Sequence, residues 1–87
     1  SAVCDSPVRE IVGDGIIVES VRRGEAGIVV RLYECERSAA EGTLVLSREF
    51  EAAECNFLEE DERPLGRSRM LKLAFRPFEI KTVLLRD

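Results

Sequence analysis

The chain has 87 residues, of which 45% are hydrophobic and 34% are charged, and its formal net charge is −4 at pH 7. This length fits a single small domain with a thin core, and the balance of apolar and charged residues excludes a disordered tail. The basic residues are scattered, whereas nucleic acids and anionic membranes require a clustered basic patch. No apolar run approaches the roughly 20 residues of a membrane-spanning helix. We therefore expect neither nucleic acid nor a membrane as a partner.

Alternation of apolar and polar residues predicts β-strands along the whole chain. An extended segment from Val8 to Val12 is followed by the turn signal Gly13-Asp14-Gly15. The next strand is predicted at Ile16–Val21, and a short connection then leads to a strand at Ile28–Cys35. In this strand Ile28, Val30 and Leu32 share one face, and Val29, Arg31 and Tyr33 share the other.

The second half of the chain is predicted to hold four more strands, at residues 43–47, 51–57 and 70–75 and from Ile80 onward. A charged loop, Leu58–Arg69, is expected before the third of these because it contains Pro64 and Gly66. Alanine and glutamate also favour helix in Arg48–Glu54, but a strand is the preferred interpretation there.

These segments predict an all-β fold, an antiparallel β-sandwich of about six to seven strands that forms one domain over residues 1–87. Leu71, Leu73 and Phe75 align on one face of their strand. Phe57 and Phe78 are expected to pack in the core together with Phe75.

Seventeen acidic residues invite the idea of a carboxylate active site. Their densest cluster, residues 59–62, lacks the alternating oxygen ligands and the glycine of a calcium loop, so it is interpreted as a solvated loop. Acidic residues on strands are expected to form cross-strand ion pairs. The expected carboxylates are Glu34, Glu36 and Glu54, and the expected cations are Arg31, Arg48 and Lys72.

Histidine is absent, and the three cysteines, Cys4, Cys35 and Cys55, lie far apart in the sequence. This set does not supply a zinc site or a histidine base for a nucleophile, and no glycine-rich phosphate-binding motif is present. We therefore predict no catalytic, cofactor-binding or metal-binding residue in this chain. Sparse cysteines of this kind are expected to be reduced thiols in a reducing, cytoplasmic compartment, with a Cys35–Cys55 bridge as the alternative.

Three segments carry a more specific pattern. The first is VESVRRGEAGIVVRLYECE, Val18–Glu36, with Glu25 in its turn and the run RLYE at Arg31–Glu34. The others are ECNFLEE, Glu54–Glu60, and RPFEIKTVLL, Arg76–Leu85. In order and spacing these segments resemble the C-terminal β domain of family 38 glycoside hydrolases, the retaining α-mannosidases.

The resemblance implies that the chain is the C-terminal domain of a large multidomain enzyme that cleaves α-linked mannose. In that family an aspartate nucleophile and a zinc ion held by aspartates and histidines lie in an N-terminal α/β domain. None of those positions falls in this chain, so the resemblance implies a non-catalytic, structural role. The alternatives are an autonomous carbohydrate-binding module, which an exposed aromatic pair would support, and an immunoglobulin-like interaction module, whose Cys–Trp–Cys pattern is missing.

Several strands are apolar on both faces, which is normally a sign that both faces are covered. We therefore expect an exposed apolar patch that contacts the preceding domains of the parent enzyme and causes the isolated chain to self-associate. The outward-facing residues are expected to be Ile17, Val21, Val29, Tyr33, Val83 and Leu85.

Overall fold

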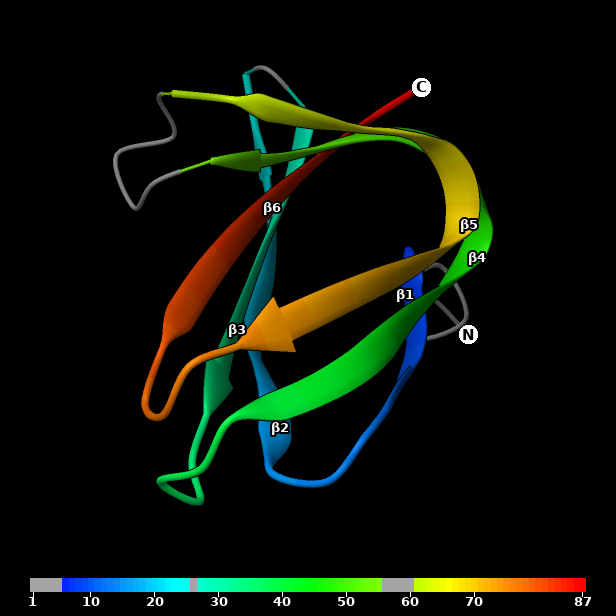
Figure 1. Ribbon diagram of the computed structural model, residues 1–87. Helices are drawn as coiled ribbons and strands as arrows, with labels where there is room; N and C mark the ends of the chain where they lie inside the picture. Colours follow the sequence, from blue (N-terminus) through cyan, green and yellow to red (C-terminus); the bar gives the residue numbers. More distant parts are fainter. Residues whose placement is uncertain (1–5, 26, 56–60) are drawn as a thin grey trace.

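The computed structural model describes residues 6–25, 27–55 and 61–87, and these ranges contain six strands and no helix (Figure 1). All strand pairs are antiparallel, so the predicted all-β antiparallel fold is confirmed. The strands are β1 (Val8–Val12), β2 (Ile16–Gly24), β3 (Gly27–Glu34), β4 (Ala40–Cys55), β5 (Arg63–Phe75) and β6 (Ile80–Arg86).

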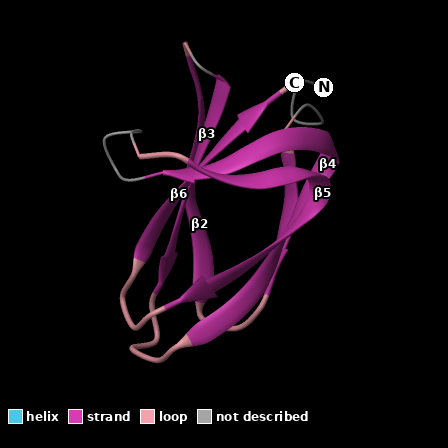
Figure 2. Cartoon of the chain, turned by 45° about the horizontal axis from the view of Figure 1, so that its top comes forward, coloured by secondary structure: helices cyan, strands magenta, loops and turns pink. Residues whose placement is uncertain are grey.

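The two layers of the sandwich are two parts of one folded sheet. The strand order is β1-β4-β6-β3-β2, and β5 pairs with β4 outside this path. The first half of β4 pairs with β1, and its second half pairs with β6, while β5 follows β4 along both halves. The β4–β5 pairing is interrupted between Val45 and Phe50, where the two strands bend together (Figures 1 and 2).

The long β4–β5 hairpin corrects two sequence predictions. Residues 43–47 and 51–55 belong to one strand, with no loop or helix between them. The predicted loop at 58–69 is wrong from Arg63 onward, because residues 63–68 pair with residues 50–54 of β4. This half of β5 looks like a loop in sequence because it is a mostly exposed, arginine-rich strand with Pro64, and proline is tolerated at such edge positions. Residues 56–60 lie outside the described ranges.

The main core lies between the two layers. Ile28, Val30 and Leu32 of β3 face inward, as predicted, and are at most 8% exposed. The predicted stripe Leu71, Leu73 and Phe75 faces them from the other layer and is equally buried.

The aromatic residues divide differently from the prediction. Phe50, at the bend of β4, is the largest fully buried side chain. Phe78 is 59% exposed, so its predicted place in the core is wrong. The reason is its position: it lies in the tight turn between β5 and β6, with a backbone φ of 60°, and not on a strand that faces the core. Phe57 lies outside the described residues.

The outer face of β3 and β6 is also apolar, but the chain covers part of it by itself. Val29, Leu84 and Cys55 form a second buried cluster there, and Val29 is only 1% exposed. The expectation of an outward patch is wrong for Val29 because it is buried, and for Val83 and Leu85 because they belong to the main core. Val21 is exposed as expected, at 38%, but it lies opposite inward-facing Val30 and therefore not on this outer face.

Gly27 begins β3 with a φ of +142°, and a side chain there would collide with the carbonyl oxygen of Leu85 on β6. Gly66 has a φ of +87° but open space around it.

We expect Gly66→Ala to lower the free energy of unfolding by about 1 kcal/mol, from backbone strain alone. Gly27→Ala should lower the free energy of unfolding by roughly 1–3 kcal/mol more than Gly66→Ala does, because of the collision. Urea unfolding of both variants measures this, and equal losses would contradict the close approach of β3 and β6.

Candidate functional site

Exposed apolar side chains gather at one end of the outer face of β2, β3 and β6. Ile17 lies opposite Tyr33, and Tyr33 lies opposite Ile80, so the three form a row across these strands. Ile17 is 42% exposed and Ile80 is 61% exposed. Phe78, Tyr33 and Ile80 also line a hollow of about 350 Å³, which we call the aromatic hollow. Its other lining residues are Glu19, Glu34 and Cys35.

One of the lining residues, Glu34, is a buried carboxylate that is only 1% exposed. Its Oε2 atom accepts the backbone N–H of Glu36 at 2.6 Å, and its Oε1 atom accepts the backbone N–H of Phe78 at 2.9 Å. The N–H of Glu34 itself donates to the carbonyl oxygen of Glu79 at 3.0 Å, and the N–H of Cys35 donates to that of Gly15 at 2.8 Å. The end of β3 therefore connects three turns, those after β1, after β3 and after β5.

Burial would raise the pKa of Glu34, but backbone hydrogen bonds outweigh it and hold the pKa below its usual value of 4.5. The donors are the amides of Phe78, Glu36, Ser38 and Arg37. The sequence-based prediction that Glu34 pairs across strands with Arg31 is wrong. Residues three apart in a strand point to opposite faces, and Glu34 follows inward-facing Leu32 by two.

Two residues with positive φ lie in the turns that Glu34 joins. Arg37 has a φ of 61° and Phe78 a φ of 60°, a region that non-glycine residues seldom adopt. The guanidinium of Arg37 also lies 5.7 Å from the centre of the Phe78 ring. The hydrogen bonds to Glu34 and this stacking together hold the exposed phenylalanine in place beside the aromatic hollow.

An ion-pair network closes the same end of the core. Lys81 is 8% exposed, and its Nζ lies 2.8 Å from Oε2 of Glu54 and 3.5 Å from Oε2 of Glu79. Burial would raise the pKa of Glu79, but the backbone N–H of Arg76 and the charge of Lys81 lower it overall. Glu54 is thus a cross-strand partner, as expected, although its partners are Lys81 and Arg63. These carboxylates pair with cations, an arrangement poorly suited to a general acid.

The acidic and cysteine side chains that the structure describes do not gather into a metal site. Within residues 6–25, 27–55 and 61–87, no group of three or more acidic or cysteine side chains could hold a metal ion. No disulfide joins Cys35, which is exposed, to Cys55, which is buried, and Cys4 lies outside the described residues. In the acidic stretch 59–62, Glu62 accepts two hydrogen bonds from Arg86, at 2.9 and 2.8 Å. The part of the chain that is described has no helix that could cross a membrane.

Sequence reasoning missed the two residues that shape this surface most, Phe78 and Glu34. The signal for Phe78 was its place directly after Pro77, which predicts a turn and not a strand. The signal for Glu34 was a single acid at the inward-facing end of an apolar strand, a position where a buried carboxylate needs several hydrogen-bond donors.

The Glu34→Gln variant tests the role of the buried carboxylate. Because folding lowers the pKa of Glu34, its ionised form stabilises the fold above pH 4.5, and this stability is lost as the pH falls through the lowered pKa. We expect Glu34→Gln to lower the urea midpoint at pH 7 and to reduce the loss of stability below pH 4.5. Glu10→Gln, at an exposed position of β1, is the control. Equal midpoints for the wild type and Glu34→Gln at pH 7 would refute this role.

Comparison with protein families gives one match. The family model for the glycosyl hydrolases family 38 C-terminal beta sandwich domain matches residues 15–83, which is most of the chain. No curated protein and no solved structure matches the chain. The match covers β2 to β5, most of β6 and Glu34 with the turns after β3 and after β5. The chain therefore belongs to the C-terminal β-sandwich domain family of family 38 glycosyl hydrolases.

Proposed function

We propose that this chain is the non-catalytic C-terminal domain of a retaining α-mannosidase, a glycoside hydrolase that cleaves α-linked mannose. The observation that carries the proposal is the family match over residues 15–83. Zinc belongs to the catalytic domain of the parent enzyme in this proposal, and the parent works in the cytoplasm. The role of this domain is structural: it packs against the preceding domains and covers their surface.

The exposed row on β2, β3 and β6 supports the packing role. Ile17, Phe78 and Ile80 are each more than 40% exposed, whereas Val29 and Leu84 on the same face are buried. Large apolar side chains that gather in this way mark an interaction surface. The turns that carry Phe78 and border Ile80 are fixed through Glu34, so the surface is preformed and loses little entropy on binding.

The first test is an activity assay of the chain of residues 1–87. We expect no hydrolysis of an aryl α-mannoside, with or without added zinc, because the described residues contain no group of side chains that could hold a metal ion and the carboxylates Glu54 and Glu79 pair with Lys81. Liberation of the aryl alcohol above the buffer rate, retained after a second purification step, would overturn the non-catalytic assignment.

The second test concerns the exposed row. We expect the isolated chain to self-associate at high concentration, and Ile80→Glu to weaken that association by placing a charge among the apolar residues. Met70→Glu is the matched control, because Met70 is 58% exposed but lies on β5, away from this face. Sedimentation velocity over a range of concentrations measures the effect. If both variants associate equally, or the wild type stays monomeric throughout, this surface is not the interface.

A carbohydrate-binding role is the second candidate, because Tyr33 and Phe78 line the same hollow with Glu19. Aromatic rings and a carboxylate are suitable contacts for a sugar. Titration with mannose and manno-oligosaccharides, observed through the Tyr33 ring resonances, decides between the two roles. Saturable shifts that Tyr33→Leu abolishes would favour sugar binding over packing.

A further inference from the structure

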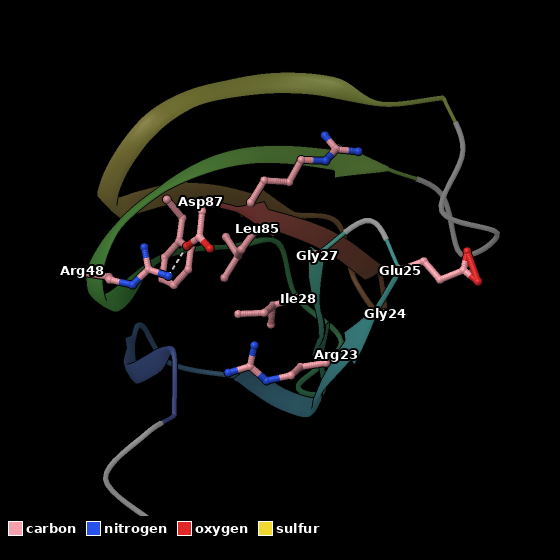
Figure 3. A pocket seen from close by; sticks show the side chains of 10 residues that line it. Arg23, Gly24, Glu25, Gly27, Ile28, Arg48, Leu85 and Asp87 are labelled. Carbon is pink, nitrogen blue, oxygen red and sulfur yellow. Dashed lines mark hydrogen bonds and ion pairs between the residues drawn. The ribbon is translucent and has the colours of Figure 1, made fainter.

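A second concave site lies at the opposite end of β3 from the aromatic hollow. It is a pocket of about 310 Å³ beside the β2–β3 hairpin, the bend of β4 and the end of β6. Its apolar lining comes from Ile28, Phe50 and Leu85, and its charged lining includes three arginines (Figure 3). We call it the arginine pocket. Concave sites of this size with an apolar floor and a few converging polar groups are typical of small-molecule binding.

Arg48 is held in place in the arginine pocket. Its guanidinium lies 4.0 Å from the centre of the buried Phe50 ring, a stacking contact that fixes its plane. One of its terminal nitrogens donates to the carboxylate of Asp87, an ion pair drawn in Figure 3. The pocket therefore already holds one carboxylate, supplied by the chain itself.

Arg23 lines the same pocket but forms no ion pair with any residue that the structure describes. Figure 3 shows its side chain extending past Ile28 toward the side on which Arg48 and Asp87 lie, whereas Glu25 points away. The third arginine, Arg86, is engaged by Glu62 through two hydrogen bonds. Among the described residues Arg23 therefore has no counter-ion, although it lines a pocket and the chain has a net charge of −4.

We propose that the arginine pocket binds a small organic carboxylate, with Arg48 and Arg23 as its two cations and the apolar floor as the contact for its carbon skeleton. Guanidinium groups match the planar geometry of a carboxylate and pair with it through parallel hydrogen bonds. Asp87 occupies part of this site, so its side chain competes with the ligand for Arg48. The site is separate from the proposed packing surface on β2, β3 and β6.

The test is a titration of the chain with sodium phenylacetate at constant ionic strength, observed through backbone amide resonances. We expect saturable shifts at Ile28 and Arg48. Arg23→Gln and Arg48→Gln should each weaken binding about two- to fivefold, the size of a partly exposed ion pair. Asp87→Asn should tighten binding several-fold, because it removes the competing carboxylate. Lys72→Gln, which removes one positive charge from β5, should leave the affinity unchanged.

Three further ligands define the specificity. Benzyl alcohol, which lacks the charge, and acetate, which lacks the ring, should each bind more weakly than phenylacetate. Inorganic phosphate should also bind more weakly than phenylacetate, because it has no apolar part that could contact the apolar floor of the pocket. Shifts that rise linearly without saturating, an Asp87→Asn variant with weaker or equal affinity, or equal binding of phosphate would overturn the proposal. An amide spectrum that stays native in Arg23→Gln, an exposed position, ensures that loss of binding is not loss of the fold.

Discussion

The burial of the Glu34 carboxylate is the constraint on which much of this small sandwich depends. A carboxylate cannot be removed from water without donors that replace the water molecules. The chain supplies these donors from the backbone of two turns that are about 40 residues apart in sequence, at Glu36 and Phe78. To do so, both turns adopt positive φ angles at Arg37 and Phe78. The cost of that strain is offset by the hydrogen bonds, and the result is a fixed arrangement of Phe78 and Ile80 on the surface.

The folded sheet explains why one face of the molecule is apolar. Because β4 and β5 bend together, one sheet provides both layers, and β3 and β6 lie in the middle of the larger layer. Their outer side is partly covered within the chain at Val29 and Leu84. It remains uncovered where Ile17, Tyr33 and Ile80 form a row. A domain that is one part of a larger hydrolase would be expected to leave such a face for its neighbour.

The sequence predicts the fold well where the pattern is local. The alternation in β3 gives the correct inward and outward faces, because each residue's direction follows from its neighbour's. The first half of β5 could not be predicted from its own residues, since its strand state comes from pairing with distant β4. The buried role of Glu34 and the exposure of Phe78 likewise depend on which turns meet at the end of β3. The arginine pocket joins residues from β2, β4 and β6 and the residue after β6, and no spacing rule connects these.

The most direct measurement of the central claim is a pH titration of the backbone amide proton resonances of Glu36 and Phe78. If one buried carboxylate accepts both protons, the two resonances shift together with a single apparent pKa below 4.5, the usual value for glutamate. At lower pH the chemical shifts of both amide protons should move together to the values of amides that donate no hydrogen bond to a carboxylate. Two amides that titrate independently, or that shift at the usual glutamate value, would contradict the account.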